Sequence, residues 1–167
     1  MAKLILKSSK LISLNDSENI DLGELRFDIS QFKIPSAMVV QKDDFISKVE
    51  RERNANGELV ETGKYTIAFK VYDRAFIELV LQNGSTEIGS PITIVVEHQE
   101  SLPIFDQYEE GEFVPITFHG IRVKPKRVQK KTFVGQGKPM IDIWQYSELK
   151  VEADSYVIGE VNETKAK

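Results

Sequence analysis

The residues best suited to chemistry in this sequence are cations interleaved with aromatic side chains. Seven basic residues and no acidic ones lie between residues 121 and 138, and Phe133 lies in the same window. Trp144 and Tyr146 follow two residues apart, a spacing that places them on one face of a strand. Cations can follow a phosphate backbone, and flat rings can stack on unpaired bases. This combination predicts a surface that binds a single nucleic-acid strand.

The predicted binding residues fall into two groups according to the part of the nucleic acid that they would contact. The residues expected to contact phosphates are Arg122, Lys124, Lys126, Arg127, Lys130 and Lys131, and those expected to stack on bases are Phe133, Trp144, Tyr146 and Tyr72. Lys70, Tyr72 and Arg74 share the polar face of another predicted strand and would line the same groove. Two alternatives stay open. Trp144, the sole tryptophan, could belong to the core, and Tyr72 could be an ordinary cross-strand partner.

The net charge of −4 conceals a segregation of charge along the chain. The window 121–138 carries +7, while the other residues contain 15 basic and 26 acidic groups. An opposite run, free of Lys and Arg, comes just before it and contains Glu97, Glu100, Asp106, Glu109, Glu110 and Glu112. Segregated charge creates strong local potentials. The pattern indicates a polyanion-binding segment or, as the simpler alternative, a solvated basic loop beside an acidic one.

Signatures of catalysis and of metal binding are scarce. Cysteine is absent, which excludes disulfides, thiol catalysis and cysteine-ligated metals. The two histidines, His98 and His119, stand alone, and no nucleotide-binding or hydrolase motif occurs. Gly135 and Gly137 are typical of a turn at a hairpin tip. We therefore expect no enzymatic activity, no cofactor, no metal site and no small-molecule substrate.

Alternating apolar residues predict a mainly β protein. The best strand is 64–73, in which Tyr65, Ile67, Phe69 and Val71 alternate with more polar positions. Further strands are expected at 76–81, 91–97, 113–124 and 138–151, with weaker ones at 22–29, 37–40 and 156–161. The strand at 138–151 is expected to pair with 113–124 through the basic loop. One short helix is expected at 42–53, followed by a turn at 54–57.

These elements predict an OB-like five-stranded antiparallel barrel with extra N-terminal strands and one short helix. Gly120 would let a long strand bend at a barrel corner. The expected organisation is an N-terminal extension at 1–60 that packs on or completes the barrel, a barrel core at 61–159 and a flexible polar tail at 160–167. The start of the chain is too polar for a signal peptide, and no stretch of about 18 apolar residues occurs, so a cytoplasmic protein without membrane association is expected.

Two segments resemble a known family. Phe118-His119-Gly120-Ile121 and the run from Leu149 to Asp154 are similar to motifs in small OB-fold proteins of Gram-positive conjugative plasmids, integrative elements and phages. The likeness covers roughly residues 64–158. It implies single-stranded DNA binding during replication or conjugative transfer of a mobile element.

The leading hypothesis is therefore a sequence-tolerant single-stranded DNA-binding protein, with RNA as an open alternative ligand. A homo-oligomer, most simply a dimer, is expected because exposed barrel edges invite pairing. The second hypothesis is a β-rich structural or assembly protein of a phage particle or transfer apparatus, in which acidic and basic segments of neighbouring subunits meet.

Overall fold

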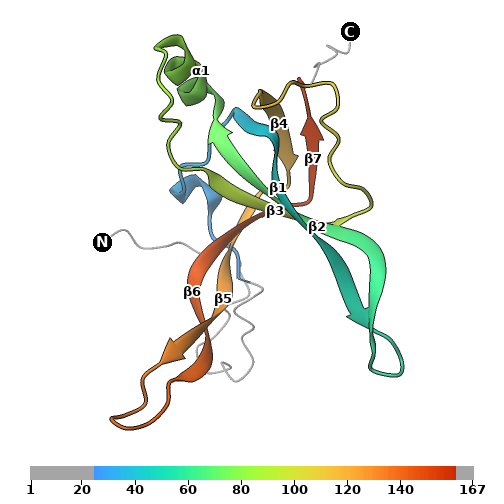
Figure 1. Ribbon diagram of the computed structural model, residues 1–167, viewed down its shortest axis with the longest axis vertical. Coiled ribbons are helices and arrows are strands. Elements are labelled where there is room, and N and C mark those ends of the chain that lie inside the picture. The colour runs from blue at the N-terminus through green and yellow to red at the C-terminus, as the bar shows by residue number, and fades with distance from the viewer. Residues whose placement is uncertain (1–24, 161–167) are drawn as a thin grey trace. The chain divides into compact units, whose positions relative to one another are not determined.

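The structure is a computed structural model that describes residues 25–160, which form a mainly β protein with one α-helix. The elements in chain order are a 3-10 turn (Ile29–Gln31), β1 (Met38–Arg53), β2 (Leu59–Asp73), α1 (Arg74–Gln82), β3 (Ile92–Gln99), β4 (Phe113–His119), β5 (Arg122–Thr132), β6 (Ile141–Ala153) and β7 (Ser155–Ile158). The mainly β class expected from the sequence is thus confirmed (Figure 1).

The described chain divides into two compact units. One contains residues up to Lys33 together with Arg122–Val151, and is named the hairpin unit here. The other contains Ile34–Ile121 and the residues from Glu152 onward, and is named the sheet unit. The division at residues 60 and 159 that the sequence suggested stays a prediction, although its first boundary lies inside β2.

The sheet unit is built on five strands in the order β3-β2-β1-β4-β7 (Figure 1). Its neighbouring strands are antiparallel, with Val40 opposite Val71 on one side of β1 and opposite Val114 on the other. Ile67, Phe69 and Val71 of β2 are fully buried, as the alternation predicted. Phe69 is the centre of this core, with ring centroids of Phe118 at 5.7 Å and Tyr156 at 4.7 Å. The sheet is not closed into a barrel.

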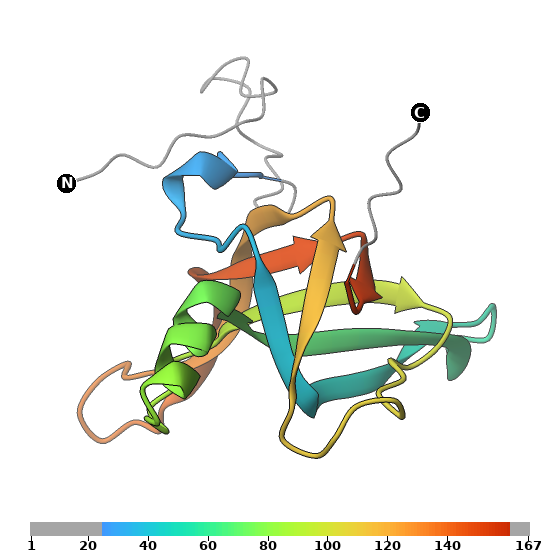
Figure 2. The ribbon, with the colours of Figure 1, turned by 90° about the horizontal axis from the view of Figure 1, so that it is seen from above.

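The helix expected at 42–53 is wrong, because these residues belong to β1. Phe45 and Val49 are four residues apart, a spacing that also puts two side chains on one face of a strand. β1 bends after Val40, where its pairing with β2 shifts register and Asp43 has a φ of 60°. Figure 2 shows this bend in β1. Residues 45–53 pair with β2, so tertiary pairing decides the conformation here.

The strand expected at 76–81 is also wrong, because these residues form most of α1. The Asp73 side chain caps the helix by accepting a hydrogen bond of 3.0 Å from the Ala75 amide. Ile77 and Val80, three residues apart, are the buried positions, a helical spacing hidden inside a continuous apolar run. No helix in residues 25–160 is long and apolar enough to cross a membrane.

The expected long strand at 113–124 is interrupted at Gly120 and forms two strands, β4 and β5. Gly120 has a φ of 69°, and a side chain there would collide with the Asp154 carboxylate. The bend predicted at this glycine is therefore present. Beside it, the His119 carbonyl accepts a 2.8 Å hydrogen bond from the Asp154 amide.

The hairpin unit consists mainly of β5 and β6, which are hydrogen-bonded neighbours. Most of the segment expected to be a basic loop is therefore strand, and the partner of β6 begins at Arg122 rather than at Phe113. Phe27 forms an isolated bridge with Val123. The other described residues of the strand expected at 22–29, which are 25, 26, 28 and 29, are not in a strand. The expected strand residues 22–24 and the tail residues 161–167 lie outside the described part.

Candidate nucleic-acid interface

The cations of the hairpin unit differ in how they are engaged. Lys126 forms an ion pair of 3.3 Å with Glu148 on the opposite strand. Lys130, Lys131 and Lys138 are exposed, and none of them has an ion-pair partner within residues 25–160. Arg122 and Lys124 are half-buried at the start of β5. The outer part of the hairpin therefore carries the positive charge that is most available to a polyanion.

The aromatic side chains of the β5–β6 hairpin lie on the surface. Trp144 is 58% exposed, Phe133 is 64% exposed and Tyr146 is 38% exposed. The question of whether Trp144 belongs to the core is thereby answered, because its ring is open to solvent. Trp144 and Tyr146 lie two residues apart on β6, so they share a face of that strand.

One cation and one ring of this surface are already in contact. The Arg127 guanidinium carbon lies over the Trp144 ring, 5.5 Å from its centroid. A guanidinium over an indole is attracted by the negative face of the ring. The contact joins β5 to β6 and restricts the orientation of the indole. It also places a positive charge beside the ring, where the phosphate of a stacked nucleotide would require one.

The three predicted site residues of the sheet unit have other roles there. Tyr72 is only 8% exposed and packs edge-to-face on Phe113, with centroids 5.8 Å apart. This burial leaves no free ring face, so the prediction that Tyr72 stacks on a base does not fit the structure. Lys70 pairs with Asp44 at 3.1 Å.

Arg74, the third of these residues, begins α1 instead of extending a strand. It pairs with Glu78 and with Glu160, both at 2.9 Å. These two contacts raise the pKa of the arginine, because hydrogen bonds to carboxylates favour its charged form. The three residues thus make their contacts within the sheet unit.

Sequence reasoning missed the apolar residues around the hairpin tip. Val134, Met140 and Ile141 are all exposed, and they flank the turn that contains Gly135 and Gly137. The available signal was the presence of large apolar residues on both sides of a glycine turn, where polar residues are usual. They add exposed apolar side chains to the end of the hairpin.

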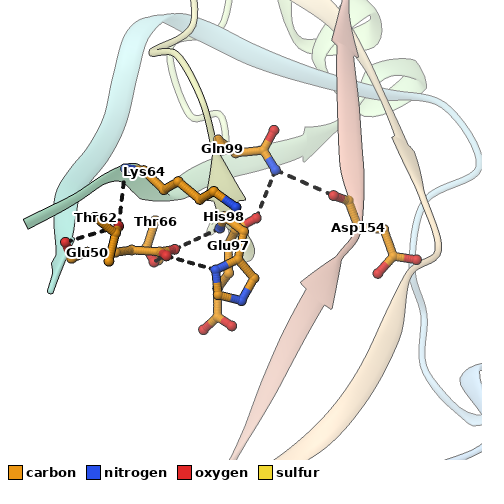
Figure 3. Close-up of polar contacts among 8 residues, drawn as sticks. All are labelled: Glu50, Thr62, Lys64, Thr66, Glu97, His98, Gln99 and Asp154. Atoms are coloured by element: carbon orange, nitrogen blue, oxygen red, sulfur yellow. Dashed lines mark hydrogen bonds and ion pairs between the residues drawn. The ribbon is translucent and has the colours of Figure 1, made fainter. Parts of the chain in front are cut away.

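A second polar cluster lies in the sheet unit and is centred on Glu50 of β1 (Figure 3). Its carboxylate accepts hydrogen bonds from the His98 amide at 2.7 Å and from the Thr66 hydroxyl at 2.9 Å, and it lies 2.8 Å from the His98 ring Nδ1. Burial alone would raise the pKa of Glu50, but the bonds from His98 and Thr66 outweigh it and lower the pKa. The carboxylate thereby ties β1 to β2 and β3.

This cluster borders an open groove of about 700 Å³ whose lining includes Lys48, Arg51 and Leu59. The Thr66 hydroxyl donates to the Glu50 carboxylate and not to the histidine, and the lowered pKa of Glu50 makes it a weak base. His98 has a φ of 60°, a conformation that the bond from its amide to Glu50 helps to hold. The arrangement fits a structural clamp. Within residues 25–160 no three potential metal-ligating side chains come together.

The comparisons with known proteins give no relative. No protein family matches the chain, and no curated protein or solved structure is similar to it.

Proposed function

We propose that this protein binds single-stranded DNA through the hairpin unit, without sequence preference and without catalysis. The observation that carries the proposal is the exposed Trp144 ring, which lies under Arg127 on the same hairpin as Lys130, Lys131 and Lys138, lysines without an ion-pair partner among residues 25–160. Stacking on such rings contributes about 1–3 kcal/mol per base and tolerates any base. Lysines that neutralise phosphates add affinity that falls as salt rises.

A single strand fits this surface better than a duplex does. Bases can reach Trp144 and Tyr146 only if they are unstacked from their neighbours. The hairpin unit is also the basic part of an acidic chain, because residues 122–151 contain eight basic and two acidic residues. Repulsion by the acidic remainder would confine a polyanion to the hairpin.

The strand order supports, as a finer proposal, a partly open OB-like barrel made of β1, β2, β3, β4 and β7. β1 pairs with both β2 and β4, and β3 approaches β7, as the ends of a nearly closed five-stranded sheet would. In this reading the hairpin unit replaces the loop between the fourth and fifth barrel strands. That loop is one of those with which OB folds contact oligonucleotides. A role in replication or transfer of a mobile element, and a homodimer, belong to the same proposal.

The direct test is fluorescence anisotropy of labelled oligo-dT at low and at rising salt, with Trp144 emission recorded in parallel. We expect binding, a loss of affinity with salt and quenching of Trp144 by the stacked base. Lys130→Ala/Lys131→Ala should reduce the slope of log K against log salt by about 1.4, since each phosphate contact to a single strand contributes about 0.7. Lys48→Ala/Lys64→Ala removes the same charge from exposed positions of the sheet unit and should leave the slope unchanged.

Two results would contradict this function. One is undetectable binding of oligo-dT at low salt. The other is an equal loss of affinity in the two double variants, which would mean that net charge alone, and not the hairpin, is responsible.

The segregated charge also favours a second candidate function, that of an assembly protein. The acidic loop from Glu100 to Glu112 and the basic hairpin could attract each other between neighbouring copies. Light scattering without nucleic acid separates the two candidates. Large salt-sensitive assemblies with no affinity for oligo-dT would favour this second function.

A further inference from the structure

The tip of the hairpin carries large apolar side chains, of which the sequence predicts only Phe133 to contact a base. Phe133 is 64% exposed and Met140 is 62% exposed, and Val134 and Ile141 beside them are exposed as well. Val123 is the one fully buried residue in the described part of the hairpin unit. The described part of this unit therefore offers no core into which these side chains could turn.

The tip is an ordered turn. The Lys138 amide donates a 3.2 Å hydrogen bond to the Gly135 carbonyl, which closes a four-residue turn. Gly137 occupies the third position with a φ of 78°, a conformation that glycine adopts without strain. Phe133 and Met140 lie on the two arms just before and just after this turn. The apolar residues are thus held together at the end of a two-stranded ribbon.

Positive charge surrounds this apolar end. Lys130 and Lys131 precede Phe133, and Lys138 precedes Met140, and none of the three has an ion-pair partner within residues 25–160. A partner that fits must offer both negative charge and an apolar interior that a side chain can enter. The junction between a duplex and a single strand offers both. Phosphates lie on either side of the last base pair, and the outer face of that base pair is not covered by another one. Proteins insert Phe, Met, Leu and Ile between base steps in this way.

We propose that the hairpin tip acts as a wedge at such junctions. Phe133 and Met140 insert against the terminal base pair, the flanking lysines hold the phosphates, and the released strand moves onto Trp144 and Tyr146. The protein then has a second activity, which is to open duplex ends rather than only to cover strands that are already single. This inference rests on the proposed function, because the captured strand must be bound by the same hairpin.

The wedge is tested with a forked DNA duplex that carries a dT tail and a fluorophore–quencher pair at the junction. The opening rate is measured with excess trap strand and with enough protein to saturate the tail. Met140→Ser leaves the predicted base-stacking rings in place, so it should keep the affinity for oligo-dT within about threefold and reduce the opening rate about tenfold, as the loss of about 1.4 kcal/mol of unstacking energy would do. Leu79→Ser, at an exposed apolar position of α1, is the matched control and should open the fork at the normal rate.

The possible outcomes separate the wedge from the function on which it rests. If the Met140→Ser variant binds oligo-dT and opens the fork as fast as the wild type, the wedge is wrong and the binding function stands. If the wild type does not bind oligo-dT at low salt, the binding function fails and the wedge fails with it. If the tip residues are instead required for binding to vesicles of anionic phospholipid, and fork opening is absent, the apolar tip serves a membrane and the wedge is overturned.

Discussion

The sheet unit and the hairpin unit use the same kinds of residue in opposite ways. In the sheet unit most phenylalanines pack on other rings, with Phe69 fully buried among Phe45, Phe118 and Tyr156. On the β5–β6 hairpin the rings of Phe133, Trp144 and Tyr146 are open to solvent, although Phe27 and Phe32 of the same unit are half-buried and pack edge to face. A buried ring increases the free energy of unfolding, whereas an exposed ring adds little to it. Exposed rings gathered on one hairpin are therefore better explained by binding than by stability.

The cations show the same difference. Several of those in the sheet unit are paired with carboxylates, as Lys70 is with Asp44 and Arg51 is with Glu61 at 3.4 Å. The outer lysines of the hairpin unit have no such partners in the described chain. Charge and aromatic character alone therefore do not identify a binding surface. Exposure and the lack of internal partners distinguish one from a set of structural residues.

The largest expected effect comes from removing one aromatic ring from each unit. Phe69→Ala should lower the free energy of unfolding by about 3–5 kcal/mol, because it leaves a cavity in the core. Phe133→Ala should change it by less than about 0.5 kcal/mol, because its ring is exposed. Urea denaturation measures both values. Comparable losses in the two variants would mean that the Phe133 ring is packed and that the contrast between the units is false.

The next effect concerns the glycine at which the chain leaves the sheet unit. Gly120→Ala should cost roughly 2–3 kcal/mol, because the positive φ adds about 1–2 kcal/mol and the new methyl group displaces the Asp154 carboxylate. Gly57→Ala is the control, since its φ of 79° is similar but nothing lies within 4 Å of the added carbon. It should cost about 1 kcal/mol by thermal denaturation. Equal costs would show that Asp154 moves aside freely.

A smaller effect is expected from the Glu50 clamp. The lowered pKa means that the carboxylate stabilises the fold when ionised, so this contribution is present above the ordinary pKa of glutamate and is lost as the pH falls through the lowered pKa. Glu50→Gln should cost about 1–3 kcal/mol at neutral pH and reduce the dependence of stability on acid pH.

Chemical denaturation across the acid range measures this effect. Glu61→Gln, at an exposed ion pair, should cost less than about 1 kcal/mol and leave the pH dependence intact. An unchanged acid slope in Glu50→Gln would show that the clamp does not stabilise the sheet.

The smallest effect is expected at the ion pair within the hairpin. Glu148→Gln releases Lys126, which should tighten binding to oligo-dT by less than about 1 kcal/mol and steepen the salt slope by about 0.7. Asp142→Asn removes a charge of the same sign from the same strand without freeing a paired lysine, and should leave the slope unaltered. If Glu148→Gln instead binds oligo-dT more weakly, the ion pair orients Lys126 for binding and does not merely neutralise its charge.

Sequence patterns predicted the parts of the fold in which local and tertiary preferences agree. The alternation around Phe69 predicted the central strand, and Gly120 predicted the bend after β4. The patterns failed at 42–53 and 76–81, which are respectively strand and helix. The segment 76–81 is short and apolar enough to fit either period, and in the charged segment 42–53 the spacing of Phe45 and Val49 fits both periods, so the two conformations depend on neighbours that are distant in the sequence.

The residue types of the candidate site were predictable from the sequence, but the set of residues that belongs to it was not. Clustered lysines and the spacing of Trp144 and Tyr146 identified the hairpin, because both features are local. The burial of Tyr72 was not predictable, since a tyrosine on the outer face of one strand becomes buried when Phe113 of another strand packs on it. The clamp made by Glu50 and His98 joins residues 48 positions apart, so no local pattern could reveal it.

The hydrogen bond between His119 and Asp154 has a consequence for how the sequence of this protein can evolve. It brings together the two points at which the chain leaves and re-enters the sheet unit, so everything between them is an insertion with adjoining ends. An insertion of this kind can lengthen, shorten or exchange its tip while the strands on either side keep their pairing. The sheet unit would then be the constant part of the fold. We expect related chains to resemble one another in the sheet unit and to differ in the inserted hairpin.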